Sequence, residues 1–345
     1  MRKLSLLAIL ITLLAFTVVA PTAAQDETLP TIADMIAERA TSADAPEFTI
    51  LNAALDASDP VVRENLAKPW NFTAFLPNDA AFEAFFAEAG MSLETLEPAL
   101  VADVLRYHFL AGQYTAVNLS AQPEVLYGTH LANNPLYITA DGETVMINEE
   151  ASVVEADIQA GNGVIHIIDR VLIPPLMLMD EAGNLSMPEA TPEPDAPAAE
   201  ELKPIFEVAA ANENFTTIAM ALEAGGLKDT LSKMIPYTVF LPTNEAVEAL
   251  LTSMNVSAED LLATPETLTP ILQYHAVSGK IDLNIMSAVA ASLVDGVPFG
   301  TQLPGTALTV TMDGETLMVN GAAVLEVIPA SNGVIYVIDT VLLPQ

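Results

Sequence analysis

Cysteine is absent from this sequence of 345 residues. Disulfide bonds, thiol catalysis, cysteine ligands for zinc and a lipid anchor on cysteine are therefore excluded, and the folded protein has to rest on its hydrophobic cores. Basic residues are also scarce: 11 Lys and Arg stand against 45 Asp and Glu, a formal net charge of −34. Such an acidic chain disfavours nucleic acid and anionic lipid as partners, because their phosphates require a basic surface. Solubility through self-repulsion is the simplest role of the acidity.

Long apolar runs are missing after the first residues of the chain. At the start, Arg2 and Lys3 precede an apolar segment over 4–20, and a few small residues end at Ala24. This order is typical of a secretory signal peptide over 1–24, and an uncleaved N-terminal anchor is the alternative. The segment is shorter than the roughly 20 residues of a membrane-spanning helix. We therefore expect a secreted, extracellular or cell-envelope protein without stable membrane insertion, and the short basic head and missing disulfides favour a bacterial source.

The sequence does contain a long internal repeat. Short motifs of the first half recur in the same order in the second half. The pairs are Phe-Leu-Pro at 75–77 and 240–242, Tyr-His at 107–108 and 274–275, Asp-Gly-Glu-Thr at 141–144 and 313–316, and Asn-Gly-Val-Ile at 162–165 and 332–335. A repeat of this length indicates duplicated domains, because solenoid units have about 20–50 residues. We place the two domains at 28–176 and 204–345.

The residues between the two copies, 180–203, are rich in proline and acidic side chains. Proline and like charges both hold a chain extended. We therefore predict a semi-rigid spacer with a separate domain at each end.

The hydrophobic periodicity changes in the same order within each copy. Short apolar strands at 73–76 and 238–241 stop at proline, and Asn78 and Thr243 follow in positions that can cap a helix. Apolar residues at spacings of three and four then indicate an amphipathic helix. Later, Asp-Gly between alternating apolar residues predicts a hairpin, and a final apolar run predicts a central strand covered on both faces. Helices early and strands late indicate an α+β fold.

Three blocks of each copy resemble the fasciclin family. They are the Phe-Leu-Pro blocks (75–82 and 240–246), the Tyr-His blocks (105–108 and 272–275) and the final blocks (162–174 and 332–344). Three blocks in the right order, found twice, make the resemblance specific. It implies two fasciclin-like domains, each a wedge-shaped β-sandwich flanked by helices, and roles in adhesion or matrix contact. In some relatives the Tyr-His region has been linked to receptor binding.

Tyr107, His108, Tyr274 and His275 are the repeated candidates for a functional site. Each histidine continues the apolar stripe of a predicted helix and therefore points to its apolar face. A metal ligand or an acid–base catalyst is the functional interpretation. That face carries no second histidine or carboxylate at helical spacing, so we interpret both histidines as buried, hydrogen-bonded structural residues.

The remaining candidates carry no catalytic pattern. Asp169 and Asp339 recur in the last strand and are interpreted as structural acceptors of hydrogen bonds. His130 and His166 are not repeated, since the second copy has glutamine and tyrosine there. The chain has no nucleophile elbow, phosphate-binding glycine loop or His-Glu-x-x-His helix. We therefore predict no catalytic, cofactor-binding or metal-binding residues and a non-enzymatic protein.

Two classes of function remain open. One is an adhesion or matrix-binding protein that contacts a cell-surface or matrix protein, a polysaccharide or another copy of the chain. The other is an extracellular carrier that holds an apolar small ligand, a lipid or a pigment, in a groove between helices and sheet. The Leu-Met-Leu-Met segment at 176–179 suits the lining of such a groove, although a strand tail packed on its own domain is the simpler interpretation. The resemblance favours adhesion.

Overall fold

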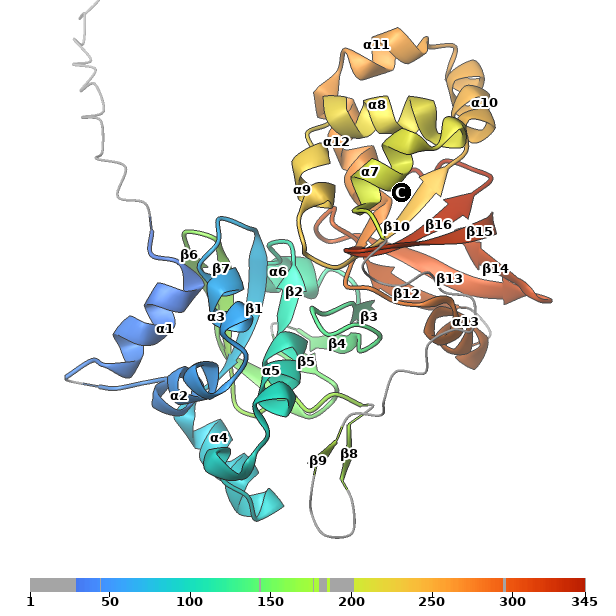
Figure 1. Ribbon diagram of the computed structural model, residues 1–345. Helices are drawn as coiled ribbons and strands as arrows, with labels where there is room; N and C mark the ends of the chain where they lie inside the picture. Colours follow the sequence, from blue (N-terminus) through green and yellow to red (C-terminus); the bar gives the residue numbers. More distant parts are fainter. Residues whose placement is uncertain are drawn as a thin grey trace, which may run out of the picture.

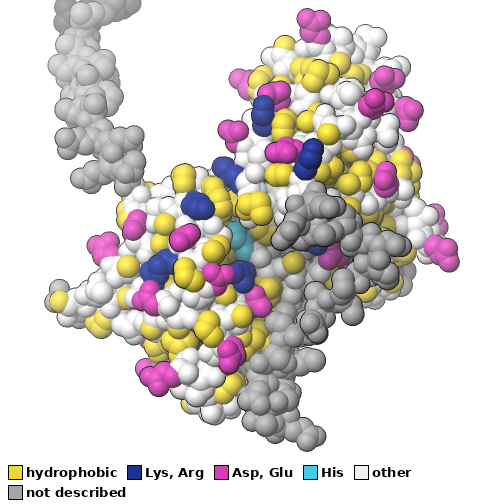
Figure 2. Space-filling model, viewed as in Figure 1, with side chains coloured by type: hydrophobic (Ala, Val, Ile, Leu, Met, Phe, Trp, Pro, Cys, Tyr) yellow, Lys and Arg dark blue, Asp and Glu magenta, His cyan; other side chains and the backbone are white. Residues whose placement is uncertain are grey.

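The computed structural model describes residues 29–43, 45–142, 144–175, 177–179, 185–186, 202–293 and 296–344. The expected signal peptide, most of the expected spacer and Leu176 lie outside these residues. The described residues form two domains with the same order of elements (Figure 1), and Asp and Glu side chains are scattered over both domains on the face shown in Figure 2. No helix of the described residues is long and apolar enough to cross a membrane.

The first domain begins with helices and ends with strands. Its helices are α1 (Ile32–Ala40), α2 (Thr49–Ala57), α3 (Pro60–Leu66), α4 (Asp79–Ala89), α5 (Pro98–Tyr107) and α6 (Ala116–Leu119). Its strands are β1 (Phe72–Pro77), β2 (Phe109–Ala111), β3 (Glu124–Tyr127), β4 (Leu136–Asp141), β5 (Thr144–Ile147), β6 (Ala151–Ala160) and β7 (Gly163–Ile168). A small hairpin of β8 (Leu178–Met179) and β9 (Leu185–Ser186) follows.

The second domain repeats this order. Its helices are α7 (Ile205–Ala211), α8 (Thr216–Ala224), α9 (Lys228–Ser232), α10 (Asn244–Met254), α11 (Ala258–Leu262), α12 (Pro265–Tyr274) and α13 (Leu283–Ser292). Its strands are β10 (Tyr237–Pro242), β11 (Ala276–Ser278), β12 (Val297–Gly300), β13 (Ala307–Asp313), β14 (Thr316–Val319), β15 (Ala322–Ala330) and β16 (Gly333–Ile338). Asn78 and Thr243 cap α4 and α10 through their side chains, as the sequence predicted.

The last strand of each domain lies inside the sheet. β7 pairs in parallel with β1 and antiparallel with β6, and β16 pairs in the same way with β10 and β15. The strand orders are β2-β1-β7-β6-β5-β4-β3 and β11-β10-β16-β15-β14-β13-β12. All residues of β7 and of β16 are buried. This confirms the central strand that the continuous apolar run predicted.

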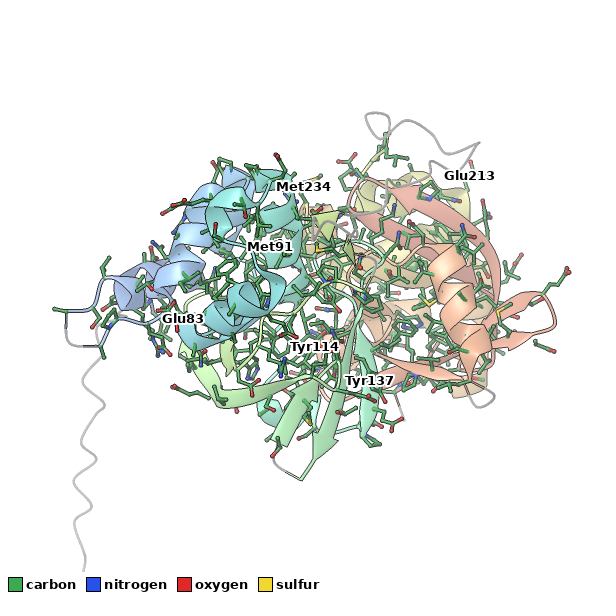
Figure 3. The ribbon with its side chains drawn as sticks, turned by 90° about the horizontal axis from the view of Figure 1, so that it is seen from below. Glu83, Met91, Tyr114, Tyr137, Glu213 and Met234 are labelled. Atoms are coloured by element: carbon green, nitrogen blue, oxygen red, sulfur yellow. The ribbon has the colours of Figure 1, made fainter. Side chains whose placement is uncertain are left out.

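The two domains contact each other directly. β3 of the first domain pairs in parallel with β12 of the second through Leu126 and Phe299, so that the two sheets join. Tyr114, which lies between the domains in Figure 3, donates its hydroxyl hydrogen to the carbonyl oxygen of Thr301 at 3.0 Å. The prediction of separate domains is therefore wrong, because the composition of a spacer carries no information about the surfaces that it joins.

A second set of contacts completes the junction between the domains. Asn133 Nδ2 donates to Asp282 Oδ2 at 2.7 Å, and the Asp282 backbone N–H donates to Asn133 Oδ1 at 2.7 Å. Nearby, Gly128 packs so closely that an added Cβ would lie 1.8 Å from the Ser278 carbonyl oxygen. The loop after β2 of the first domain thus contacts the loop after β12 of the second, and the loop after β3 of the first contacts the loop after β11 of the second.

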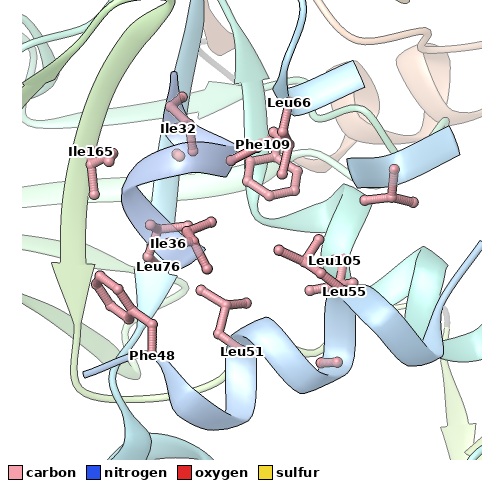
Figure 4. Close-up of a cluster of buried hydrophobic side chains, with 14 of the residues drawn as sticks. Ile32, Ile36, Phe48, Leu51, Leu55, Leu66, Leu76, Leu105, Phe109 and Ile165 are labelled. Atoms are coloured by element: carbon pink, nitrogen blue, oxygen red, sulfur yellow. The ribbon is translucent and has the colours of Figure 1, made fainter. Parts of the chain in front are cut away.

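Each domain has two hydrophobic cores, one on each face of the central strands. In the first domain, Leu76 and Ile165 of β1 and β7 face the helices α1, α2 and α5 (Figure 4). Phe75 and Ile168 face the opposite way, toward strands β3–β5. Register irregularities in β6 let the sheet bend over this second core. The fold is the predicted α+β arrangement, a β-sandwich flanked by helices.

The hairpin between β13 and β14 differs from the prediction by one residue. Asp313 pairs with Thr316, so the two turn residues are Gly-Glu and not Asp-Gly. Gly314 has φ 62°, and glycine at the first turn position is the pattern of a type II′ turn. The pairing at 141–144 in the first domain is the same.

Candidate functional site

The histidine of the first Tyr-His pair is buried and uses both ring nitrogens. His108 Nδ1 lies 2.7 Å from the Val104 carbonyl oxygen, and the Leu172 backbone N–H donates to His108 Nε2 at 3.0 Å. Because a carbonyl oxygen can only accept, Nδ1 carries the proton and the ring is neutral. Burial lowers the pKa of His108 to about 4, against the hydrogen bond to Val104, which raises it. The ring connects the end of α5 to the segment that follows β7.

His275 repeats this arrangement in the second domain. Its Nδ1 lies 2.8 Å from the Ile271 carbonyl oxygen, and the Leu342 backbone N–H donates to its Nε2 at 2.9 Å. Burial again lowers the pKa to about 4. Neither ring has a nitrogen left for a metal ion or for proton transfer to a substrate, so we continue to infer a structural role for both.

The tyrosine of each pair connects the same helix end to the hairpin strands. Tyr107 Oη accepts from Asn148 Nδ2 at 2.9 Å and donates to the Pro135 carbonyl oxygen at 3.3 Å. Tyr274 makes the equivalent contacts, with Asn320 in the place of Asn148. Both asparagines have positive φ, a conformation that asparagine tolerates well. Burial raises the pKa of Tyr107 above its ordinary value, so the hydroxyl stays protonated.

The repeated aspartates lie at the end of the central strand. Asp169 Oδ1 accepts from the Ser152 backbone N–H at 2.7 Å, and Asp339 Oδ1 accepts from the Ala323 backbone N–H at 2.9 Å. Each carboxylate therefore joins the end of β7 or β16 to the start of the antiparallel strand beside it. Both residues are exposed.

His166 and its counterpart in the second domain, Tyr336, are different donors that bind equivalent backbone carbonyl oxygens. His166 Nε2 donates to the Tyr114 carbonyl oxygen at 2.9 Å. Tyr336, at the matching position, donates its hydroxyl hydrogen to the Ile281 carbonyl oxygen at 2.9 Å. Burial lowers the pKa of His166, which keeps the ring neutral.

His130 packs among aromatic rings. The centroid of its ring lies 5.2 Å from that of Phe72 and 6.5 Å from that of Phe109. Burial, and then the charge of Arg106, lower the pKa of His130 to about 4. Its Nε2 is buried without a hydrogen-bond partner among the described residues. Over all the residues that the structure describes, no group of three or more His, Asp or Glu side chains is placed to hold a metal ion.

The sequence prediction gave no role to a further repeated residue, the asparagine of each Asn-Gly-Val-Ile motif. Asn162 Oδ1 accepts from the Ile32 backbone N–H at 2.8 Å, and its Nδ2 donates to the carbonyl oxygens of Leu66 and Lys68 at 2.7 and 2.8 Å. Asn332 makes the same three contacts in the second domain. The available signal was a polar residue at the same place in both copies, directly before an apolar strand.

Two apolar cavities between the helices and the sheet are small. A cavity of about 40 Å³ in the second domain is lined by Leu251, Leu268 and His275, and one of about 30 Å³ in the first is lined by Phe82 and Leu105. Small-molecule sites in proteins usually have roughly 300–1,000 Å³. In this arrangement neither cavity has room for a lipid or a pigment.

A larger cleft of about 370 Å³ lies between the two domains. Its first-domain wall consists of the loops before β1 and after β2, with Trp70 and Gln113. Its second-domain wall includes α9 and α12. Lys233 directly follows α9, and Gln273 lies on α12. Asp and Glu are missing from the described residues that line it. The cleft is therefore neutral to slightly basic in a strongly acidic protein.

Comparisons with known proteins agree with the geometry. The family model of the fasciclin domain matches residues 46–174 and 213–344. Protein sll1483 of Synechocystis sp. is 42% identical over 142 residues, covering 41% of this chain and 73% of the relative. The transforming growth factor-beta-induced protein ig-h3 of Oryctolagus cuniculus is 26% identical over 290 residues, covering 82% of this chain but only 36% of the relative.

The comparison with solved structures returned a pair of FAS1 domains. The pair is from the insect cell adhesion molecule fasciclin I, with a TM-score of 0.38 and 16% identity, covering 86% of this chain and 96% of that chain. The chain belongs to the fasciclin family and carries two copies of the domain in tandem.

Proposed function

We propose that the protein is a non-enzymatic adhesion or matrix-binding protein that is secreted or held at the cell envelope. The observation that carries the proposal is the direct junction of the two domains through β3 and β12. A joined pair presents features of both domains in one fixed geometry, and a preorganised surface loses less entropy when it binds. Membership of the fasciclin family supports the same class of function.

The placement of the family-motif side chains also supports binding over catalysis. His108 and His275 are 2% and 3% exposed, and each has both ring nitrogens in hydrogen bonds inside its own domain. A general acid or base has to reach the proton that it transfers. Recognition is therefore assigned to the outer surface and to the cleft between the domains.

The proposed partner is a cell-surface or matrix protein or a polysaccharide. The net charge of −34 disfavours polyanionic partners such as nucleic acid. Association between copies of the chain is a further mode of contact that an adhesion protein of this kind can use.

The proposal is tested by measuring binding of residues 25–345, fluorescently labelled, to cells and extracted matrix of the source organism and to an array of glycans. We expect saturable binding that excess unlabelled protein displaces. Labelled serum albumin, which is also acidic, is the control for charge-driven adsorption. If none of these surfaces binds the protein more strongly than it binds albumin, the proposal is wrong.

A carrier of an apolar ligand is the second candidate, retained because the helix–sheet layers are lined by apolar side chains. The cavities of about 40 and 30 Å³ argue against it. Mass spectrometry of an organic extract of the purified protein decides the matter. One stoichiometric lipid or pigment would replace adhesion by the carrier function.

A further inference from the structure

The cleft between the domains has the volume of a ligand site and walls from both domains. Its volume of about 370 Å³ lies in the range of small-molecule sites. Gln302 Nε2, from the second domain, donates to the Ala111 carbonyl oxygen at 2.8 Å and to Tyr114 Oη at 2.9 Å, at the edge of the cleft. The junction therefore fixes both walls of the cleft before a ligand arrives.

Trp70 supplies the aromatic surface of the cleft. It is the only tryptophan of the chain, is partly exposed, and packs against the helix-side cores of both domains. Lys68 Nζ lies 5.0 Å from the centroid of its ring. The indole N–H has no hydrogen-bond partner among the described residues. A partly exposed indole offers an apolar face and a hydrogen-bond donor in one place.

Neutral polar side chains supply the rest of the cleft. Asn71, Gln113, Thr230 and Gln273 line it. Within the described part of the chain, their side chains have no hydrogen-bond partner, nor does Lys233 Nζ. An amide offers two donor hydrogens and an acceptor oxygen, which suits a ligand with many hydroxyl groups.

The charges and the polar groups of the cleft together disfavour other classes of ligand. A lipid or another wholly apolar molecule would bury these amides without partners, which is costly. A cationic ligand would find no carboxylate among the described lining residues, and a polyanion is repelled by the net charge of −34. A neutral molecule with many hydroxyl groups and an apolar ring face fits, and a saccharide has both properties.

We propose that the cleft binds a short segment of a neutral saccharide, with one sugar ring against Trp70 and its hydroxyl groups hydrogen-bonded to Gln113 and Gln273. This inference rests on the proposed function and names the site and the ligand class for it. The indole packs on the C–H face of the ring, and the two amides, one from each domain, select for hydroxyl groups. Binding therefore requires both domains together.

The single tryptophan makes the test specific to the cleft. Fluorescence of the protein is measured while maltohexaose, cellohexaose, chitotetraose and an oligomer of mannuronate are titrated in separately. We expect a saturable change in the emission of Trp70 with at least one of the three neutral probes and a weaker response or none with the uronate. No saturable change with any neutral probe, or preference for the uronate, overturns the proposal.

Matched variants connect that signal to the amides. We expect Gln113→Ala and Gln273→Ala each to weaken binding of the responding probe by about tenfold, the effect of one lost hydrogen bond. Asn284→Ala is the control, because it removes an exposed amide from another helix, α13, away from the cleft. Thermal unfolding of every variant shows that it is folded. If Gln113→Ala and Gln273→Ala bind the probe as tightly as the control Asn284→Ala, the proposal is overturned.

A separate measurement distinguishes failure of this inference from failure of the proposed function. The double variant Gln113→Ala, Gln273→Ala is compared with the unmodified protein for binding to cells and matrix. Loss of binding supports the cleft as the recognition site. Undiminished binding to cells, together with no response to saccharides, refutes the cleft and leaves adhesion through another surface.

Discussion

Replacing His108 by leucine should destabilise the protein strongly at neutral pH. The substitution removes the proton donor to the Val104 carbonyl oxygen and the acceptor for the Leu172 backbone N–H. Leu172 is 3% exposed, so water does not readily replace the lost contact. A buried polar group without a partner costs roughly 1–3 kcal/mol. For two such groups, partly offset by the apolar fit of leucine, we expect the free energy of unfolding to fall by about 3 kcal/mol.

The size of this loss should depend on pH, with a sign that the structure fixes. Burial holds the pKa of His108 at about 4 in the folded protein, whereas an unfolded histidine has its ordinary value of 6.5. Between these values the unfolded chain binds a proton that the folded protein does not bind, so the wild type loses stability as the pH falls. Leucine does not titrate. The difference between variant and wild type should therefore shrink by about 2 kcal/mol between pH 6.5 and about pH 5.

The assay is urea unfolding followed by circular dichroism, at several values from about pH 7 to about pH 5. His275→Leu is the matched variant in the second domain and should behave in the same way, since His275 has the same contacts and a pKa of about 4. Metal content is measured for each protein by elemental analysis. A difference in stability that stays constant with pH would refute the reasoning, and so would a stoichiometric metal lost on substitution.

Three further predictions each concern the substitution of one residue. Asn332→Ala removes three hydrogen bonds of a buried amide and should lower the free energy of unfolding by about 3 kcal/mol in urea unfolding; a loss within error of zero contradicts this. Gly128→Ala places a methyl group against Ser278 and should open the junction, seen as a larger radius of gyration in X-ray scattering with unchanged circular dichroism. Gly314→Ala forces alanine to positive φ in an open turn and should cost about 1–2 kcal/mol in thermal unfolding, whereas no change would mean that the turn rearranges.

The sequence predicted the helices, the strands and the sandwich, but it did not predict the junction between the domains. Apolar runs, helix caps and the hairpins at Asp-Gly are local signals, and the structure confirmed these elements. The hairpin turns are shifted by one residue, to Gly-Glu in the second domain, because Asp-Gly and Gly-X both suit two-residue turns whose twist matches that of the strands. The junction combines a backbone pairing of Leu126 with Phe299, the close approach of Gly128 to Ser278, and isolated polar side chains such as Asn133 and Asp282. Such residues have no distinctive composition or periodicity, so only the assembled structure brings them together.

The internal repeat allows the chain to serve as its own comparison. Where the two domains keep a residue, as at His108 and His275, the structure gives both the same two partners. Where they differ, the shared contact shows what the position requires: His166 and Tyr336 have different acid–base chemistry, yet each donates one hydrogen bond to the same loop of its domain. A catalytic histidine could not be exchanged for tyrosine in this way without losing its base. Residues that differ in chemistry at a shared place are the ones to examine for function. Trp70 and its counterpart in the second domain, the aliphatic Ile235, both line the cleft between the domains, and of the two only the tryptophan adds an aromatic face and an N–H donor there.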